Sequence, residues 1–182
     1  MELKLSNIEV ILLSIVNEKP SYAYEIDKTI ELREMRRWVR VGVASVYQVL
    51  KRLEEKGLVY SCIEKEGRMP ERKRYYVTNE GSEALAETSK KLLSSFEWHY
   101  LHLSVGLETS DLLTSAEMED CLEKRLARVR ANKSKLEEKY GVQNGESFKK
   151  KAVIKNLIFL RRAEERFLQE ILAELQAHCL SD

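Results

Sequence analysis

The chain contains few of the residues that interrupt helices or cross-link small folds: 2 Pro, 7 Gly and 3 Cys among 182 residues. So little proline and glycine excludes collagen-like and low-complexity chains. The cysteines, Cys62, Cys121 and Cys179, are odd in number and widely spaced, which excludes a disulfide framework and paired metal-ligand spacing. We expect reduced thiols, with a redox sensor as the alternative, and neither a metal nor a cofactor.

Long apolar runs and catalytic motifs are also missing. No uninterrupted apolar stretch reaches the roughly 18 residues of a membrane span, and the N-terminus has no signal-peptide pattern, so we expect a cytoplasmic protein that does not enter a membrane. Three scattered His residues, with no nucleophile elbow and no glycine-rich phosphate loop, offer nothing to carry chemistry. An enzyme is therefore the least favoured class.

The composition that remains is 43% hydrophobic and 34% charged, which is typical of a helix-rich globular protein of one ordinary domain or two small ones. The net charge of +1 conceals a segregation. Between Arg36 and Arg74 there are eleven cations against five acids, a local net of +6, so the rest of the chain sums to −5. A surface that attracts anions is thus expected in the first half.

The stretch at residues 41–58 organises this first half. Val46, Val49, Leu50 and Leu53 recur at three- and four-residue steps and predict a helix with one buried face, which Gly57 ends. The opposite face mixes small, hydrogen-bonding and cationic residues: Ala44, Ser45, Tyr47, Gln48, Lys51 and Arg52. This composition suits a helix that reads base edges and grips phosphates, although an ordinary solvated face has much the same residues.

Two helices precede this one and a hairpin follows it. Ser6 with Glu9 reads as a capping box that begins the first helix, and Ser21 can cap the second. Residues 58–63 and 74–78 are β-prone around a breaker cluster at residues 66–70, and Val39 with Val41 could form one more short strand. Three helices and a hairpin with basic residues predict a winged helix-turn-helix, in which the third helix enters the major groove of DNA.

The second half reads as helices with apolar seams. Thr78 can cap a helix whose seam runs through Leu85, Ser89, Leu92, Phe96, His99 or Tyr100, and Leu103. A long helix from Ser115 and another over about residues 147–178 follow; the expected seams are Met118, Leu122, Leu126, Val129, Leu136 and Tyr140 in the former and Val153, Leu157, Leu160, Phe167, Ile171 and Leu175 in the latter. We therefore expect a mainly α chain with a winged-helix domain at residues 1–80 and an antiparallel helical dimerisation domain at residues 81–182, giving a homodimer.

These residues together resemble the PadR-type transcriptional regulators. The matching pieces are Leu12-Leu13 with Pro20, Ala23-Tyr24-Glu25-Ile26, Ser45-Val46-Tyr47, Leu50 to Leu58, Arg72 to Thr78, Gly81 and Ala84-Leu85. The resemblance implies a dimeric winged-helix repressor that binds double-stranded DNA. It also implies a C-terminal half that dimerises and in some members binds an aromatic effector. Gln48 stands where the family commonly has proline, so an operator preference does not carry over.

The expected roles follow from these patterns. Ser45 and Gln48 would read base edges; phosphates would be held by Tyr47, Lys51 and Arg52 on the helix, by Arg68, Arg72, Lys73 and Arg74 on the hairpin, and by Tyr22 as a weaker candidate. The aromatic stretch containing Phe96, Trp98 and Tyr100 has two open interpretations, a dimer core and a pocket for a small aromatic effector. A winged helix that contacts only protein remains the alternative function.

Overall fold

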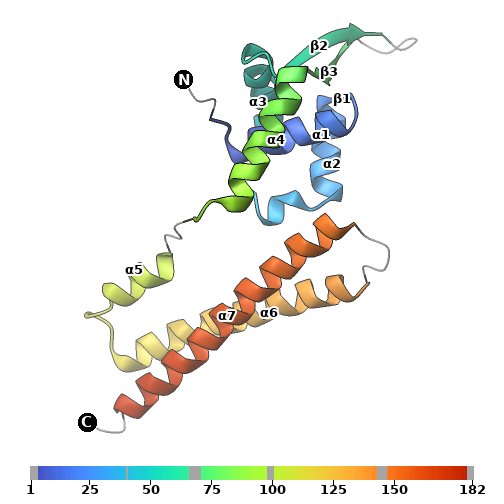
Figure 1. Ribbon diagram of the computed structural model, residues 1–182. Helices are drawn as coiled ribbons and strands as arrows, with labels where there is room; N and C mark the ends of the chain where they lie inside the picture. Colours follow the sequence, from blue (N-terminus) through green and yellow to red (C-terminus); the bar gives the residue numbers. More distant parts are fainter. Residues whose placement is uncertain (1–3, 40, 66–70, 98–100, 143–146, 180–182) are drawn as a thin grey trace. The chain divides into compact units, whose positions relative to one another are not determined.

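The computed structural model describes residues 4–39, 41–65, 71–97, 101–142 and 147–179. The chain forms two compact units, Met1–Trp98 and His99–Asp182, each held together by contacts among its own residues. Each is described by itself below, and both can be followed in Figure 1.

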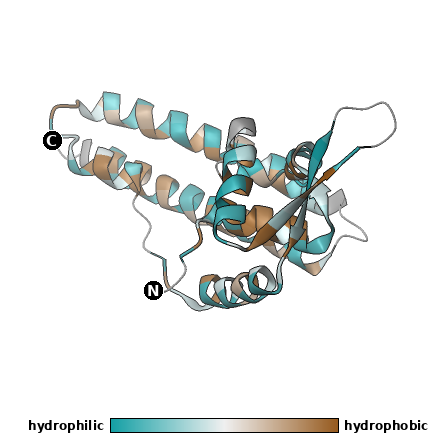
Figure 2. Cartoon of the chain, turned by 90° about the horizontal axis from the view of Figure 1, so that it is seen from above, coloured by the Kyte–Doolittle hydropathy of each residue, from teal (hydrophilic) through white to brown (hydrophobic). Residues whose placement is uncertain are grey.

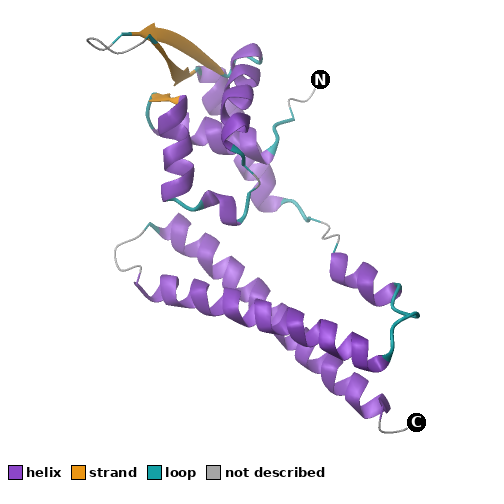
Figure 3. Cartoon of the chain, turned by 180° about the vertical axis from the view of Figure 1, so that it is seen from behind, coloured by secondary structure: helices purple, strands orange, loops and turns teal. Residues whose placement is uncertain are grey.

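The first unit combines helices with a small antiparallel sheet. Its elements in chain order are α1 (Asn7–Glu18), β1 (Ser21–Tyr22), α2 (Ala23–Leu32), the 3-10 turn η1 (Met35–Arg37), α3 (Val43–Glu55), β2 (Val59–Glu64), β3 (Arg72–Val77) and α4 (Asn79–Ser94). The strands run in the order β1-β3-β2 and lie together in Figure 3. Three helices followed by a β-hairpin are the predicted winged helix-turn-helix, which confirms the fold class.

The helix ends use the residues that the sequence indicated. The Ser6 backbone N–H donates to Glu9 Oε2 at 2.8 Å, which completes the capping box of α1. At the C-terminal end of α3, Gly57 has a φ of +71° and ends the helix in the left-handed region. At the start of α4 the Thr78 hydroxyl accepts the Gly81 N–H at 2.9 Å.

The third strand is not where the sequence placed it. Val39 and Val41 form no strand among the described residues; instead Ser21 and Tyr22 pair with Tyr75 and Arg74 of β3. Ser21 is therefore a strand residue and Tyr22, not Ser21, is the N-cap of α2. The prediction was wrong because two residues become a strand only when a distant edge offers partners for their backbone groups.

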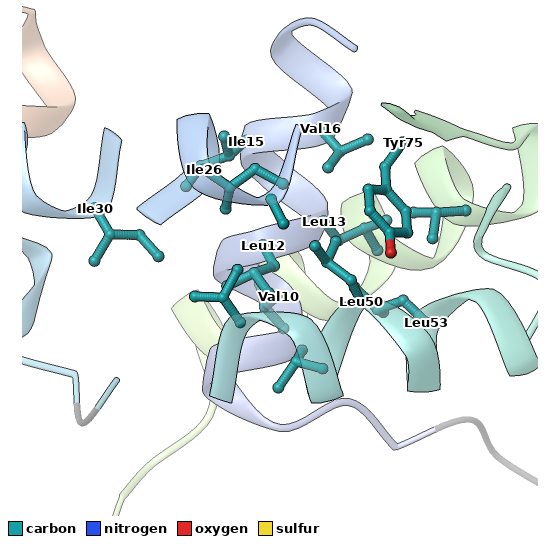
Figure 4. Close-up of a cluster of buried hydrophobic side chains, with 14 of the residues drawn as sticks. Val10, Leu12, Leu13, Ile15, Val16, Ile26, Ile30, Leu50, Leu53 and Tyr75 are labelled. Carbon is teal, nitrogen blue, oxygen red and sulfur yellow. The ribbon is translucent and has the colours of Figure 1, made fainter. Parts of the chain in front are cut away.

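The core of this unit lies among α1, α2, α3 and the base of β3. Leu12 and Leu13 of α1 meet Ile26 and Ile30 of α2, and Figure 4 shows Leu50, Leu53 and Tyr75 joining them. Full burial of each such aliphatic side chain stabilises the fold by about 1.5–3 kcal/mol. This packing fixes which side of α3 faces inward.

The helix that begins at Asn79 is shorter than its seam predicted. α4 ends at Ser94, Ser95 is extended with ψ of 144°, and Leu103 belongs to a separate helix. Phe96, a predicted seam residue, is 80% exposed. The helix breaks at Ser94 and Ser95, because serine side chains compete for backbone hydrogen bonds. The spacing of apolar residues continues past this break and therefore gave no sign of it.

α4 also lies in the first unit, where it packs on α1. A Cβ at Gly81 would come within 2.0 Å of the Leu58 carbonyl oxygen, so only glycine permits this close crossing. The compact unit consequently extends beyond residue 80, although that boundary for the DNA-binding domain stays a prediction.

The described residues of the second unit form the helices α5 (His102–Glu108), α6 (Ser115–Val142) and α7 (Phe148–Cys179). α6 and α7 form the expected pair, joined by buried Leu122, Leu126 and Val129 of α6. Ion pairs run along the same pair of helices, including Lys133 Nζ to Glu165 Oε2 at 2.5 Å. Within the described residues, no helix is long and apolar enough to cross a bilayer.

The seam of α7 agrees with the prediction only in part: Leu157, Ile171 and Leu175 pack against the buried clusters as predicted. The side chains buried against α6 are Ile154, Ile158, Leu168 and Leu172. Three of the predicted seam residues lie partly in solvent instead: Val153 at 37%, Leu160 at 47% and Phe167 at 39% exposure. α7 therefore carries two apolar stripes, and a single sequence cannot say which stripe meets α6.

Candidate nucleic-acid interface

α3 separates its buried and exposed sides as predicted. Val46, Val49, Leu50 and Leu53 have at most 1% of their surface exposed. On the other side Tyr47 is 57% exposed, Gln48 is exposed and Ser45 is half-buried. The helix thus offers one hydroxyl, one amide and one phenol to a neighbouring molecule.

The two predicted cations of α3 differ in their surroundings. The Lys51 side chain is 77% exposed and lies 3.7 Å from Glu55, one turn along the same helix. Arg52 Nε lies 4.0 Å from the buried carboxylate of Glu9, and the Arg52 side chain is 51% exposed. Lys51 is accordingly the cation of α3 that a polyanion can reach more easily.

Glu9 links α1 to α3. Its side chain is 5% exposed, and Lys56 Nζ donates to Glu9 Oε1 at 2.6 Å. Burial would raise the pKa of this carboxyl, but the hydrogen bonds from Lys56 and from the Ser6 backbone and hydroxyl outweigh burial and lower the pKa. Glu9 is therefore a carboxylate at neutral pH and holds α3 by its C-terminal end.

We call β2 and β3 the wing. Residues directly opposite each other in an antiparallel pair share a face, and here Ser61 pairs with Tyr75, Ile63 with Lys73 and Glu64 with Arg72. The inner face, toward α3, carries Ser61, Ile63, Lys73 and Tyr75; the outer face carries Tyr60, Cys62, Glu64, Arg72, Arg74 and Tyr76. β3 is hydrophilic beside the tip and hydrophobic at its other end (Figure 2).

Strand alternation consequently divides the predicted basic residues of the wing. Lys73 lies on the inner face, while Arg72 and Arg74 lie on the outer face. Arg68 falls outside the described residues. Three neighbours in sequence thus cannot all approach one anion from the same side.

Glu64 organises the outer face. Its carboxylate accepts the hydroxyl protons of Tyr76 at 2.6 Å and Tyr22 at 2.8 Å, and Arg74 Nη1 lies 3.3 Å away. The hydrogen bonds from Tyr76 and Tyr22, which outweigh partial desolvation, lower the pKa of Glu64. Tyr22 is only 8% exposed. The contact of Tyr22 with a phosphate stays a prediction, and the Tyr22 hydroxyl is bonded to Glu64 in this structure.

The outer face also stacks arginine on tyrosine. Arg74 lies 5.4 Å from the centroid of the Tyr22 ring, and Arg72 lies 5.3 Å from that of Tyr24. The Tyr22 and Tyr24 rings are themselves stacked at 5.8 Å. These cation–π contacts tie β3 to the start of α2.

The roles of the acidic residues at this site were not predicted. Glu54 and Glu64 were expected only as charges that oppose the cations, whereas each carboxylate joins two or more elements. No local pattern distinguishes such a carboxylate from one on a solvated surface. Only the presence of these acids within a basic stretch of sequence could have suggested that they have a structural role.

The predicted effector residues are only partly described. Phe96 is exposed beyond the end of α4, whereas Trp98 and Tyr100 lie outside the described residues. The second unit has an open pocket of about 460 Å³ between α5 and α6. Its walls include Leu107, Leu122 and Arg128.

Comparison with known proteins relates part of the chain to one family. Residues 12–87, which include α3 and the wing, match the family described as "Transcriptional regulator PadR-like family". Because the match covers less than half of the chain, it shows that this stretch is similar to the family. PadR-like proteins are transcription regulators and not enzymes. A search of curated proteins finds no match.

Solved structures share the fold over most of the chain. Bacillus subtilis PadR in complex with operator DNA has 18% identity and a TM-score of 0.78, covering 93% of this chain and 99% of that one. The same protein in complex with p-coumaric acid gives 17% identity, a TM-score of 0.75 and coverage of 93% and 98%. The Vibrio cholerae virulence activator AphA has 18% identity and a TM-score of 0.71, and the match covers 94% of this chain and 99% of that one. At these identities the likeness concerns the fold alone.

Proposed function

We propose that this PadR-like chain is a homodimeric repressor that binds a palindromic operator through α3 and the wing. The observation that carries the proposal is the exposed polar side of α3, with Tyr47, Gln48 and Lys51, next to the inner face of the wing, with Lys73. A hydrogen-bonding helix face flanked by cations is what recognition of a duplex in its major groove requires. The B. subtilis complex with operator DNA supports the use of this fold for that purpose.

The contacts fall into two groups. Ser45 and Gln48 read base edges, whereas Tyr47, Lys51, Arg52 and Lys73 hold phosphates; Tyr22, Arg68, Arg72 and Arg74 remain candidates for phosphate contacts at the outer side of the wing and its tip. Residues 1–80 supply this surface and residues 81–182 supply the dimer contacts, in a protein that works in the cytoplasm.

The exposed stripe of α7 supports the homodimer. Val153, Leu160 and Phe167 are spaced by seven residues, as in a coiled-coil seam, and each is more than a third exposed in the single chain. A second copy would cover this stripe and set two winged heads at a fixed separation, which a two-fold symmetric operator matches. Sedimentation at micromolar concentration should give the dimer mass, and a monomer would contradict this part of the proposal.

The test of DNA recognition is protection of the DNA upstream of the protein's own coding region. We expect one protected palindrome, with binding that weakens steeply as salt rises. The alternative, a winged helix that contacts only protein, predicts no protection and no salt-dependent duplex binding. Because AphA, which shares the fold, is an activator, repression has to be tested separately. Reporter expression that falls when the protein is present would support repression, and expression that rises would contradict it.

Release by a small planar aromatic compound is the remaining part of the proposal. The p-coumaric acid complex of B. subtilis PadR supports it, as does the presence of two candidate sites, the stretch of Phe96, Trp98 and Tyr100 and the pocket between α5 and α6. A Trp38→Phe variant leaves Trp98 as the sole tryptophan. Quenching of its fluorescence by members of a panel of aromatic acids, with loss of operator binding, is expected; no response to any compound would refute it.

A further inference from the structure

One carboxylate joins α3 to both strands of the wing. Glu54, in the last turn of α3, accepts the hydroxyl proton of Ser61 at 2.5 Å through Oε1. Its other oxygen, Oε2, lies 3.8 Å from Lys73 Nζ. Ser61 belongs to β2 and Lys73 to β3, so Glu54 contacts each strand once.

The arrangement follows from the register of the wing. Ser61 is directly opposite Tyr75, and Lys73 is two residues before Tyr75 on the same face. Tyr75 is 6% exposed and fixes the base of this face in the core. Burial, with Glu54 and Tyr47 nearby, raises the pKa of Tyr75, which agrees with the three side chains being neighbours.

Electrostatics make Glu54 an unexpected residue at this position. Its side chain is 31% exposed and lies 3.8 Å from Lys73, the cation on the inner face of the wing. A carboxylate there repels phosphates and reduces affinity for any duplex. A contribution to general DNA affinity therefore does not explain why a carboxylate stands at position 54. Control over the position of the Lys73 side chain does explain it.

We propose that Glu54 is a positioning residue that determines specificity. It holds the Lys73 ammonium and the wing at a fixed offset from Gln48 and Lys51, so that Lys73 meets a phosphate only when α3 is in register with its operator. It also lowers affinity for arbitrary DNA. The inference rests on the proposed function and adds a division of roles within that surface.

The decisive variant is Glu54→Gln in the full-length chain. The amide oxygen can still accept from Ser61, but the attraction for Lys73 is lost. We expect tighter binding to a random duplex, a steeper dependence of binding on salt, and a fall of about tenfold in the ratio of operator to random affinity.

Glu55→Gln is the matched control. It removes the same charge from the same helix turn, but the ion pair of Glu55 is with Lys51 in α3 and not with the wing. Both variants should bind random DNA more tightly because both remove a negative charge. Only Glu54→Gln should change the ratio, with Glu55→Gln altering it by less than about twofold.

A cycle with Lys73→Met separates positioning from a merely structural role. In the Lys73→Met background, Glu54→Gln should leave the ratio unchanged, because the group that Glu54 positions is gone. Ser61→Ala provides a second route that keeps both charges: it should lower the ratio without changing the salt dependence. Circular dichroism and thermal melting establish that each variant is folded.

Three results would overturn the inference. They are equal changes in ratio for Glu54→Gln and Glu55→Gln, an effect of Glu54→Gln that persists without Lys73, or a Ser61→Ala variant with the wild-type ratio. If the wild-type protein protects no site and binds duplexes without salt dependence, the proposed function itself fails. That failure is visible before any variant is made.

Discussion

Glu9 of α1 and Lys56, the C-cap residue of α3, form an ion pair in which the carboxylate is 5% exposed and the atoms are 2.6 Å apart. The two residues are 47 positions apart in sequence. Glu9 also completes the capping box of α1, so one side chain both starts a helix and fixes the helix proposed to read DNA.

This pair should contribute measurably to stability. Glu9→Gln removes a charged hydrogen bond from a mostly buried site, and we expect a loss of about 2 kcal/mol in the free energy of unfolding. Glu55→Gln, which disturbs an exposed pair, should cost less than about 0.5 kcal/mol. Urea unfolding of both variants at pH 7 provides the comparison, and equal losses would contradict a special role for Glu9.

The same pair predicts a pH dependence. Because the pKa of Glu9 is lowered in the folded state, its stabilisation is present above the pKa of glutamate in the unfolded chain, about 4.3, and is lost as pH falls through the lower folded value. The difference in stability between wild type and Glu9→Gln should therefore be full at pH 7 and should shrink as pH falls below about 4.3. A difference that grows on acidification would mean that the pKa of Glu9 is raised in the folded state, which would contradict this prediction.

The exposed side of α3 should separate sequence reading from general affinity. Gln48→Ala should cost about 1–3 kcal/mol at one base position of the operator and little on random DNA. Lys51→Ala should weaken binding to every duplex and reduce the salt slope by about one. Titrations on operator and random DNA at several salt concentrations measure both, and parallel losses for the two variants would end this division.

Strand alternation predicts different roles for two adjacent cations of the wing. Lys73→Met should reduce the salt slope of DNA binding by about one, because Lys73 is on the face toward α3. Arg74→Met should change the slope much less and instead lower the melting temperature, since Arg74 is engaged with Glu64 and the Tyr22 ring. Equal slope changes would mean that the outer face also meets phosphates.

Two glycines should tolerate alanine differently. Gly57 has φ of +71° and open space around it, so Gly57→Ala should cost only the backbone strain of about 1–2 kcal/mol. A Cβ at Gly81 would lie 2.0 Å from the Leu58 carbonyl oxygen, and Gly81→Ala should cost about 3 kcal/mol or more. Thermal melting ranks the two variants, and the reverse order would place α4 elsewhere.

The sequence by itself determined those features that depend on neighbouring residues. The buried stripe of α3, the caps at Ser6 and Thr78 and the stop at Gly57 all follow from helical periodicity and local hydrogen bonding, and the winged-helix fold followed from their order. The exposed residues of α3 could be predicted for the same reason.

Tertiary structure alone decided what depends on distant partners. β1 exists because β3 offers an edge, α7 buries Ile154 and Leu168 because α6 lies on that side, and α4 crosses Leu58 because position 81 is glycine. Alternation along β3 turned Lys73 inward and Arg74 outward, and packing brought Glu54 to the wing and Glu9 to Lys56. Pairings between residues far apart in the chain leave no periodic trace in the sequence, because either partner alone is compatible with a solvated surface.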